Sequence, residues 1–120
     1  MSRAHHLAYA KRLALDLAEK GYTQPAPRTD IKVLGKEALG MVYVGADGFV
    51  TGNYMSEHDQ VIAEKLGEVL SGGEISQALT EVSEQYLLNL ERKAFLELCS
   101  TRKTLERIQS LITKGKILRN

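Results

Sequence analysis

The chain is 120 residues long, with 43% hydrophobic residues, 26% charged residues and a formal net charge of +1. This composition is typical of a soluble globular domain and excludes a disordered or low-complexity chain, and no apolar run approaches the roughly 18 residues that a membrane span requires. Cys99 is the single cysteine, which excludes an internal disulfide and predicts a protein of the reducing cytoplasm.

The first predicted element is an amphipathic helix over residues 7–20. Its apolar residues recur at steps of three and four, and Gly21 follows at the position where a left-handed C-cap is expected. The stripe consists of Leu7, Ala10, Leu13, Ala14 and Leu17. Pro25 and Pro27 then favour extended backbone. We therefore predict three parts, which are an N-terminal helix at 1–22, a connector at 23–33 and a helical C-terminal module at 34–120.

The segment over residues 35–52 fits two structures. Taken locally, residues 41–44 and 49–51 flank Asp47-Gly48 and have the pattern of a β-hairpin. Taken by period, the apolar residues form a helical stripe made of Leu39, Val42, Tyr43, Ala46, Phe49 and Val50. Glycine in a helix costs about 1 kcal/mol relative to alanine, but an isolated hairpin is only marginally stable and has no other predicted strand to join. We predict a helix and keep the hairpin as a minor alternative. The glycines spaced to let a neighbouring helix approach closely are Gly45, Gly48 and Gly52.

A capped helix is predicted from Ser56 to Leu70. Ser56 and Asp59 have the spacing of a capping box, in which each side chain binds the other residue's backbone amide. The buried stripe consists of Ile62, Leu66, Val69 and Leu70. Gly72-Gly73 ends this helix, and residues 74–82 are predicted to form a loop.

Two more amphipathic helices are predicted within residues 81–120. The first has Ser83 as its N-cap, and the second is capped by the hydroxyl of Ser100 or Thr101 and ends at Gly115. The apolar stripe of the first is Tyr86, Leu87, Leu90, Ala94, Phe95 and Leu98, and that of the second is Leu105, Ile108, Leu111 and Ile112. The elements together predict an all-α bundle of about five amphipathic helices.

Positive charge is concentrated at the end of the chain. From Cys99 onward there are six basic residues and one acidic residue, whereas the preceding part has ten basic and fourteen acidic residues. Such a tail favours an anionic ligand or surface, while a solvated helix face that complements the acidic remainder accounts for the same charges. Nucleic-acid binding is not expected, because the net charge is near zero and aromatic residues do not alternate with the basic ones.

Sequence motifs for catalysis are missing. No two glycines are two positions apart, which excludes the Gly-x-Gly-x-x-Gly dinucleotide loop, and no Gly-Lys-Ser/Thr phosphate loop occurs. No His-x-x-x-His pair or cysteine cluster offers metal ligands. Glu91 and Glu97 are candidates for acid and base work, but carboxylates on a charged helix face are generally solvated. We expect no catalytic residue, no metal site and no cofactor held by this chain alone.

Several stretches carry a resemblance to a known family. They are YMSEHD at 54–59, IAEKL at 62–66, VSEQYLLNLERKAFL at 82–96, KTLERIQ at 103–109, KGK at 114–116 and the ending LRN. With these stretches the chain resembles the C-terminal region of large bacterial 3-hydroxyacyl-CoA dehydrogenases that also carry a crotonase-type enoyl-CoA hydratase domain and serve fatty-acid β-oxidation. The resemblance runs from Leu7 to Asn120, with Ile117 where the family usually has proline.

The resemblance implies a non-catalytic helical part that braces the catalytic domains and helps to cover the acyl-CoA site. The NAD-binding loop, the dehydrogenase His/Glu pair and the crotonase oxyanion-hole loop of the family are absent, so we expect a C-terminal fragment that oxidises nothing alone. NAD and acyl-CoA are then cofactor and ligand of the full-length enzyme. The implied partner is the remainder of the dehydrogenase/hydratase polypeptide, and self-association is expected when that remainder is missing.

The resemblance also implies contact residues for coenzyme A. In crotonases, basic and apolar residues of the last helix reach the adenine and phosphate end of this ligand, and the matching positions here are Leu111, Lys114 and Lys116. The alternative is that these lysines only complement the dipole at the helix C-terminus. For the whole chain, the alternative function is a free-standing helical interaction or assembly module with no enzymatic role.

Overall fold

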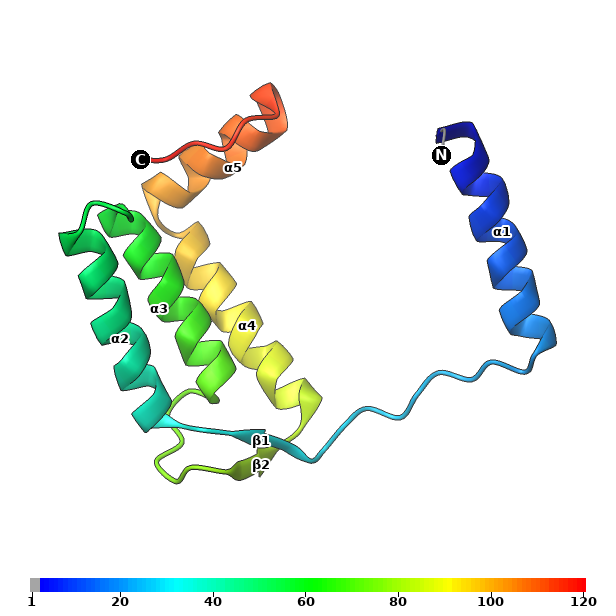
Figure 1. The fold of residues 1–120 in the computed structure, drawn as a ribbon, viewed down its shortest axis with the longest axis horizontal. Helices are drawn as coiled ribbons and strands as arrows, with labels where there is room; N and C mark the ends of the chain where they lie inside the picture. Colours follow the sequence, from blue (N-terminus) through cyan, green and yellow to red (C-terminus); the bar gives the residue numbers. More distant parts are fainter. Residues whose placement is uncertain (1–2) are drawn as a thin grey trace.

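The structure is a computed structural model and describes residues 3–120 (Figure 1). It contains five helices and two short strands. In chain order these are α1 (Arg3–Glu19), β1 (Ile31–Val33), α2 (Lys36–Thr51), α3 (Glu57–Ser71), β2 (Thr80–Val82), α4 (Glu84–Cys99) and α5 (Arg102–Lys114). The prediction of an all-α protein with about five helices is confirmed.

The segment over residues 35–52, which fits two structures by sequence, is the helix α2. It runs through Asp47-Gly48, so the helix is confirmed and the hairpin alternative is wrong. The helical stripe faces α3, where Ala46 is 5% exposed and Val42 lies so close to Gly67 that a Cβ there would be 2.7 Å from Cγ1 of Val42. The close approach between helices therefore uses Gly67 of α3. The side of α2 that carries Gly45 and Gly48 meets open space.

The two strands form a small antiparallel sheet between segments far apart in the chain. Ile31 pairs with Val82, Lys32 with Glu81 and Val33 with Thr80. The predicted loop over residues 74–82 is therefore wrong at its end, and a strand occupies the last three residues of the predicted connector. Strands of three residues are too short to show alternation in the sequence. Tertiary contacts stabilise them, since the side chains of Val33 and Val82 are 3% and 8% exposed.

The predicted helix caps are confirmed with one exception, while α1 begins at Arg3 and so extends four residues before its predicted start. Ser56 and Asp59 form the complete capping box, Ser83 Oγ accepts from the amide of Tyr86, and Gly115 adopts the left-handed conformation after α5. Thr101 is the N-cap of α5, but its side chain makes no capping bond. Its hydroxyl instead donates to the carbonyl of Leu98 at 2.7 Å, because the turn between α4 and α5 brings that carbonyl within reach.

Figure 1 shows α2, α3 and α4 side by side, the two strands at one end of them, and α5 at the other end. Helix α1 stands apart from this body, at the end of an extended connector. The radius of gyration is 19.4 Å, against about 14 Å for a compact chain of this length. Among residues 5–120, the buried apolar residues are Val33, Ala46, Val82 and Ala94. The division at residues 22 and 33 stays a prediction.

Candidate functional site

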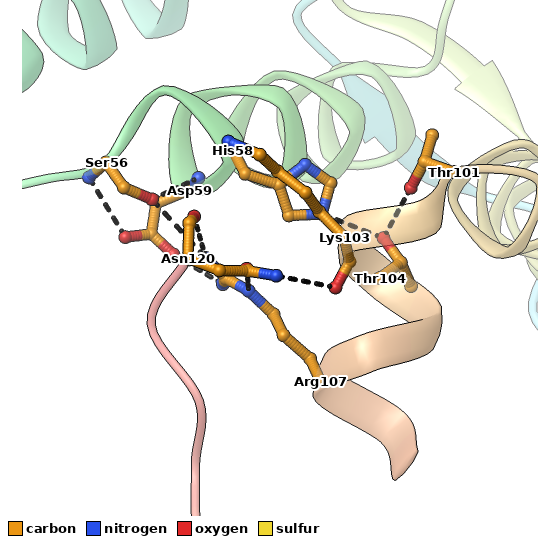
Figure 2. A network of polar contacts seen from close by, with 8 residues as sticks. All are labelled: Ser56, His58, Asp59, Thr101, Lys103, Thr104, Arg107 and Asn120. Carbon is orange, nitrogen blue, oxygen red and sulfur yellow. Dashed lines mark hydrogen bonds and ion pairs between the residues drawn. The ribbon is translucent and has the colours of Figure 1, made fainter. Parts of the chain in front are cut away.

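Helix α5 is fastened to the start of α3 by a polar network centred on Arg107 (Figure 2). Its Nη1 donates to Asp59 Oδ1 at 2.6 Å, and its Nη2 donates to Ser56 Oγ at 3.3 Å. The side chains of Arg107 and Asp59 are only 18% and 29% exposed. Because the guanidinium contacts two residues of one capping box, it fixes where α5 lies relative to the first turn of α3.

Asn120 closes the network from the other side. It accepts from Arg107 at its side-chain oxygen (2.8 Å) and at its backbone carbonyl (3.3 Å), and its amide donates to the carbonyl of Lys103 (3.2 Å) and the carboxylate of Glu106 (2.9 Å). The left-handed residue Gly115 reverses the chain so that residues 116–120 return along α5. The end of the chain is thereby folded onto the same helix that carries Arg107.

The network keeps Asp59 ionised. The pKa of this carboxyl is lowered from 3.8 to about 2, chiefly by the hydrogen bond from Arg107 and then by the backbone amide of Ser56. Both donors favour the charged form. The ion pair between α3 and α5 is therefore complete at any pH above about 4.

His58 lies beside this ion pair and is 5% exposed. Its Nε2 is 2.9 Å from Thr104 Oγ1, which is 2.9 Å from Thr101 Oγ1, so that a chain of hydrogen bonds leads from α3 to the turn between α4 and α5. Its pKa is lowered from 6.5, first by burial and then by the positive charges of Arg107 and Lys103, while Asp59 acts in the opposite direction. His58 is thus a neutral, hydrogen-bonded residue at pH 7, and it connects helices.

Three of the six stretches that carry the family resemblance meet in this network. YMSEHD contributes Ser56, His58 and Asp59, KTLERIQ contributes Thr104 and Arg107, and the ending LRN contributes Asn120 (Figure 2). Sequence reasoning found the capping box and missed every contact between the stretches. Arg107 and Asp59 are 48 positions apart, and a contact at that separation leaves no periodic signal.

The predicted coenzyme A contacts lie outside the network. Leu111 and Lys114 are one helical turn apart on the last part of α5, and Lys116 follows the reversal at Gly115. All three are exposed, and the Ser110 hydroxyl donates to the carbonyl of Lys116 at 2.9 Å. The structure brings Leu111 and Lys114 to one exposed helix face.

A second feature is an apolar groove between β1, α3 and α4. Its volume is about 840 Å³. Its apolar lining is formed by Ile31, Val33, Ile62, Leu66, Val69, Leu70, Leu87, Leu88, Ala94, Phe95 and Leu98. Several of these side chains are more than half exposed, with Leu66 and Phe95 at 57% and Leu70 at 69%. Such a surface is incompletely covered in the isolated chain. Leu111, Lys114 and Lys116 do not line it.

Lys65 joins the two helical walls of the groove. Its ammonium group contacts Glu68 of α3 at 2.9 Å and Glu97 of α4 at 2.7 Å. Lys65 in turn lowers the pKa of Glu97 by its hydrogen bond and its charge. A carboxylate held ionised in this way is a poor proton donor, which argues against acid chemistry at Glu97.

No group of three or more potential metal ligands occurs within the part of the chain that the structure describes. In the same part, no helix combines the length and the apolar character needed to cross a membrane.

Comparison with known proteins gives one finding that bears on function. A probable 3-hydroxyacyl-CoA dehydrogenase of Bacillus subtilis (strain 168) is 42% identical over 116 residues, which cover 96% of this chain. The chain is similar to a segment of a dehydrogenase. It spans only 14% of the length of that relative. No protein-family model matches the chain, and no solved structure does.

Proposed function

We propose that this chain is the non-catalytic C-terminal helical part of an NAD-dependent 3-hydroxyacyl-CoA dehydrogenase of fatty-acid β-oxidation, and that it acts in the cytoplasm. Its role is to brace the catalytic domains, including a crotonase-type domain, and to help cover the acyl-CoA site. The observation that carries the proposal is the 42% identity over 96% of the chain to a small part of a probable dehydrogenase. Activity, NAD and acyl-CoA belong to the complete enzyme.

Helix α2 supports a role inside a larger body. The face with Ala46 packs on α3, while Met41 and Val44 on the opposite face are 69% and 77% exposed. Gly45 and Gly48 continue that outer face and have no atom near the position of an added Cβ. A helix that is apolar all round is normally buried on all sides. We therefore propose that the outer face of α2 packs against the catalytic part of the enzyme.

Complementation tests this proposal. The matching segment is deleted from the Bacillus subtilis relative, and the present chain is supplied as a separate polypeptide. We expect the two to co-purify and to recover NAD-dependent oxidation of a 3-hydroxyacyl-CoA, because the chain restores the missing brace. Failure of the pair to associate or to recover activity would favour the alternative function, a free-standing interaction module.

A matched pair of variants locates the contact. Val44→Glu places a charge on the outer face of α2 and is expected to abolish co-purification. Leu15→Glu introduces the same charge at an exposed leucine of α1 and is expected to leave it intact, since Leu15 is 56% exposed and lies on another helix. Equal behaviour of the two variants would contradict the assignment of α2 as the docking face.

We also propose that Leu111, Lys114 and Lys116 contact acyl-CoA in the complete enzyme. The support is their exposure on an element that Arg107 and Asn120 hold in place, and charge-assisted hydrogen bonds from lysine suit phosphate. Lys114→Ala together with Lys116→Ala is expected to raise KM for acyl-CoA several-fold with kcat nearly unchanged. Arg102→Ala, at another exposed base of α5, is the control. An unchanged KM in the double variant would refute this contact.

A further inference from the structure

Besides the outer face of α2, residues 5–120 leave two further apolar surfaces uncovered, the stripe on α1 and the groove between β1, α3 and α4. On α1, Leu7, Leu13 and Leu17 are 79%, 47% and 42% exposed, although they form one side of an amphipathic helix. Short isolated helices are only marginally stable in water, and an apolar face needs a surface to pack on. The groove offers an apolar surface of the complementary kind.

The dimensions of the two surfaces agree. The part of α4 that lines the groove, from Glu84 to Leu98, is about 21 Å long at 1.5 Å per residue. The stripe from Leu7 to Leu17 is about 15 Å long by the same measure. The stripe therefore fits within the length of the groove.

Both surfaces carry charges of both signs. The charged residues that line the groove are Lys32, Lys65, Glu84, Glu91 and Arg92. Between residues 5 and 20, the chain has three bases, Lys11, Arg12 and Lys20, and two acids, Asp16 and Glu19. Each surface therefore offers groups that can pair with the opposite sign on the other.

The connector decides whose groove α1 enters. It leaves the body at Arg28, whose backbone exchanges hydrogen bonds with Glu84 at the rim of the groove. Residues 21–30 are exposed, and Figure 1 shows them carrying α1 away from the body. Pro25 and Pro27 favour this extended backbone, which holds α1 apart from the groove of its own body. An extended spacer presents α1 to another molecule.

We propose that α1 of one copy docks in the groove of a second copy, and that two copies exchange their α1 helices in a twofold-symmetric dimer. The apolar stripe of α1 packs on Leu66, Leu88 and Phe95 of the partner copy, and the same contact forms in reverse. In such a closed dimer the α1 stripe and the groove of each copy are both buried. The proposal goes beyond the enzyme function above and uses faces other than the outer face of α2.

The mass of the complete 120-residue chain in solution tests the exchange. Light scattering after size-exclusion chromatography is expected to give twice the chain mass of 13.3 kDa. Leu13→Glu together with Leu17→Glu is expected to reduce the mass to that of one chain, because it places two charges in the apolar stripe that packs on the groove. Both leucines are exposed, so the body should remain folded, as far-ultraviolet circular dichroism would show.

Leu15→Glu is the matched control. It is the same substitution on the same helix at a similarly exposed leucine that points away from the stripe, so the dimer should persist. A wild-type chain that is a monomer at high concentration, or a dimer unaffected by the double variant, would overturn the proposal.

Disulfide trapping distinguishes exchange from docking within one chain. Cys99 is replaced by serine in all variants. A copy with Leu17→Cys is mixed under oxidising conditions with a copy carrying Leu66→Cys, and a covalent dimer of the two is expected. When Leu15→Cys replaces Leu17→Cys, little covalent dimer should form. If a chain with both Leu17→Cys and Leu66→Cys forms its bond only internally, α1 occupies its own groove and exchange is refuted. None of these tests involves the dehydrogenase, so their failure leaves the proposed function standing.

Discussion

Helix α3 is held by α2 and by α5 in different ways. The contact with α2 is apolar and close, with Val42 against Gly67 and Ala46 buried. The contact with α5 is polar, with Arg107 paired to Asp59 and His58 bonded to Thr104. The first depends on shape and should be insensitive to pH. The second depends on charge and should weaken in acid, so the position of α5 is the more adjustable of the two.

The largest expected effect is at the apolar contact. Gly67→Val places methyl groups where even a Cβ would lie 2.7 Å from Val42 Cγ1, and we expect a loss of about 3 kcal/mol in the free energy of unfolding. Urea unfolding at a fixed protein concentration measures it. Gly45→Val adds the same side chain to open space on α2 and should change stability by less than about 0.5 kcal/mol. Equal effects would show that the contact is not tightly packed.

Breaking the polar contact should cost somewhat less. Arg107→Ala leaves the half-buried carboxylate of Asp59 without its partner and releases Asn120, so we expect a loss of about 2 kcal/mol in the same assay. Arg102→Ala removes an exposed ion pair with Glu106 on the same helix and should cost less than about 0.5 kcal/mol. If Arg107→Ala lowered the free energy of unfolding no more than this control, the network would not stabilise the fold.

Acid should weaken the polar contact through Asp59. Its pKa is lowered from 3.8 in the unfolded chain to about 2 in the fold, so its stabilisation is complete above pH 4 and is lost as the pH falls towards 2. We expect about 1–2 kcal/mol over this window. Asp59→Asn retains an oxygen for the Ser56 amide and removes the charge, so its stability should fall less between pH 4 and pH 2. Parallel curves for the two proteins would contradict the assignment.

The smallest effect is expected at His58 in a separate pH window. Its pKa is lowered from 6.5, so the fold favours the neutral ring, and stability should decline as the pH falls below 6.5. The ring is hydrogen-bonded to Thr104, and its pKa is lowered by the charges of Arg107 and Lys103 and raised by that of Asp59. We expect a smaller decline between pH 7 and pH 5 than the acid loss at Asp59, and His58→Gln should remove it. If the stability of His58→Gln still declined between pH 7 and pH 5, another titrating group would be responsible.

Much of the fold could be predicted because it is local. Helix periodicity, the Ser56–Asp59 capping box and the stop at Gly115 each involve residues within a few positions of one another. The strands could not be predicted, since each has three residues and its partner is about fifty positions away. The sequence around Thr101 predicts a side-chain cap for α5. In the structure its hydroxyl donates instead to the carbonyl of Leu98, which the turn at the end of α4 brings close.

The candidate site divides in the same way. The resemblance selected the stretches that meet around Arg107, and the residues Leu111, Lys114 and Lys116 stay predictions. It did not reveal that Asn120 and Asp59 share one guanidinium, because such a meeting depends on how α5 crosses the end of α3. The groove was equally hidden, since a stripe of leucines reads the same whether its partner lies in the chain or outside it.

The sequence by itself determined where the helices run, how they are capped and which side of each is apolar, because these properties depend on spacing over one or two turns. Tertiary structure alone decided which apolar sides are covered. It paired Val42 with Gly67, joined β1 to β2 and fastened α5 through Arg107, and it left the stripe of α1 and the outer face of α2 exposed. The physical reason is that burial is a property of two surfaces, and a pattern along the chain describes only one of them.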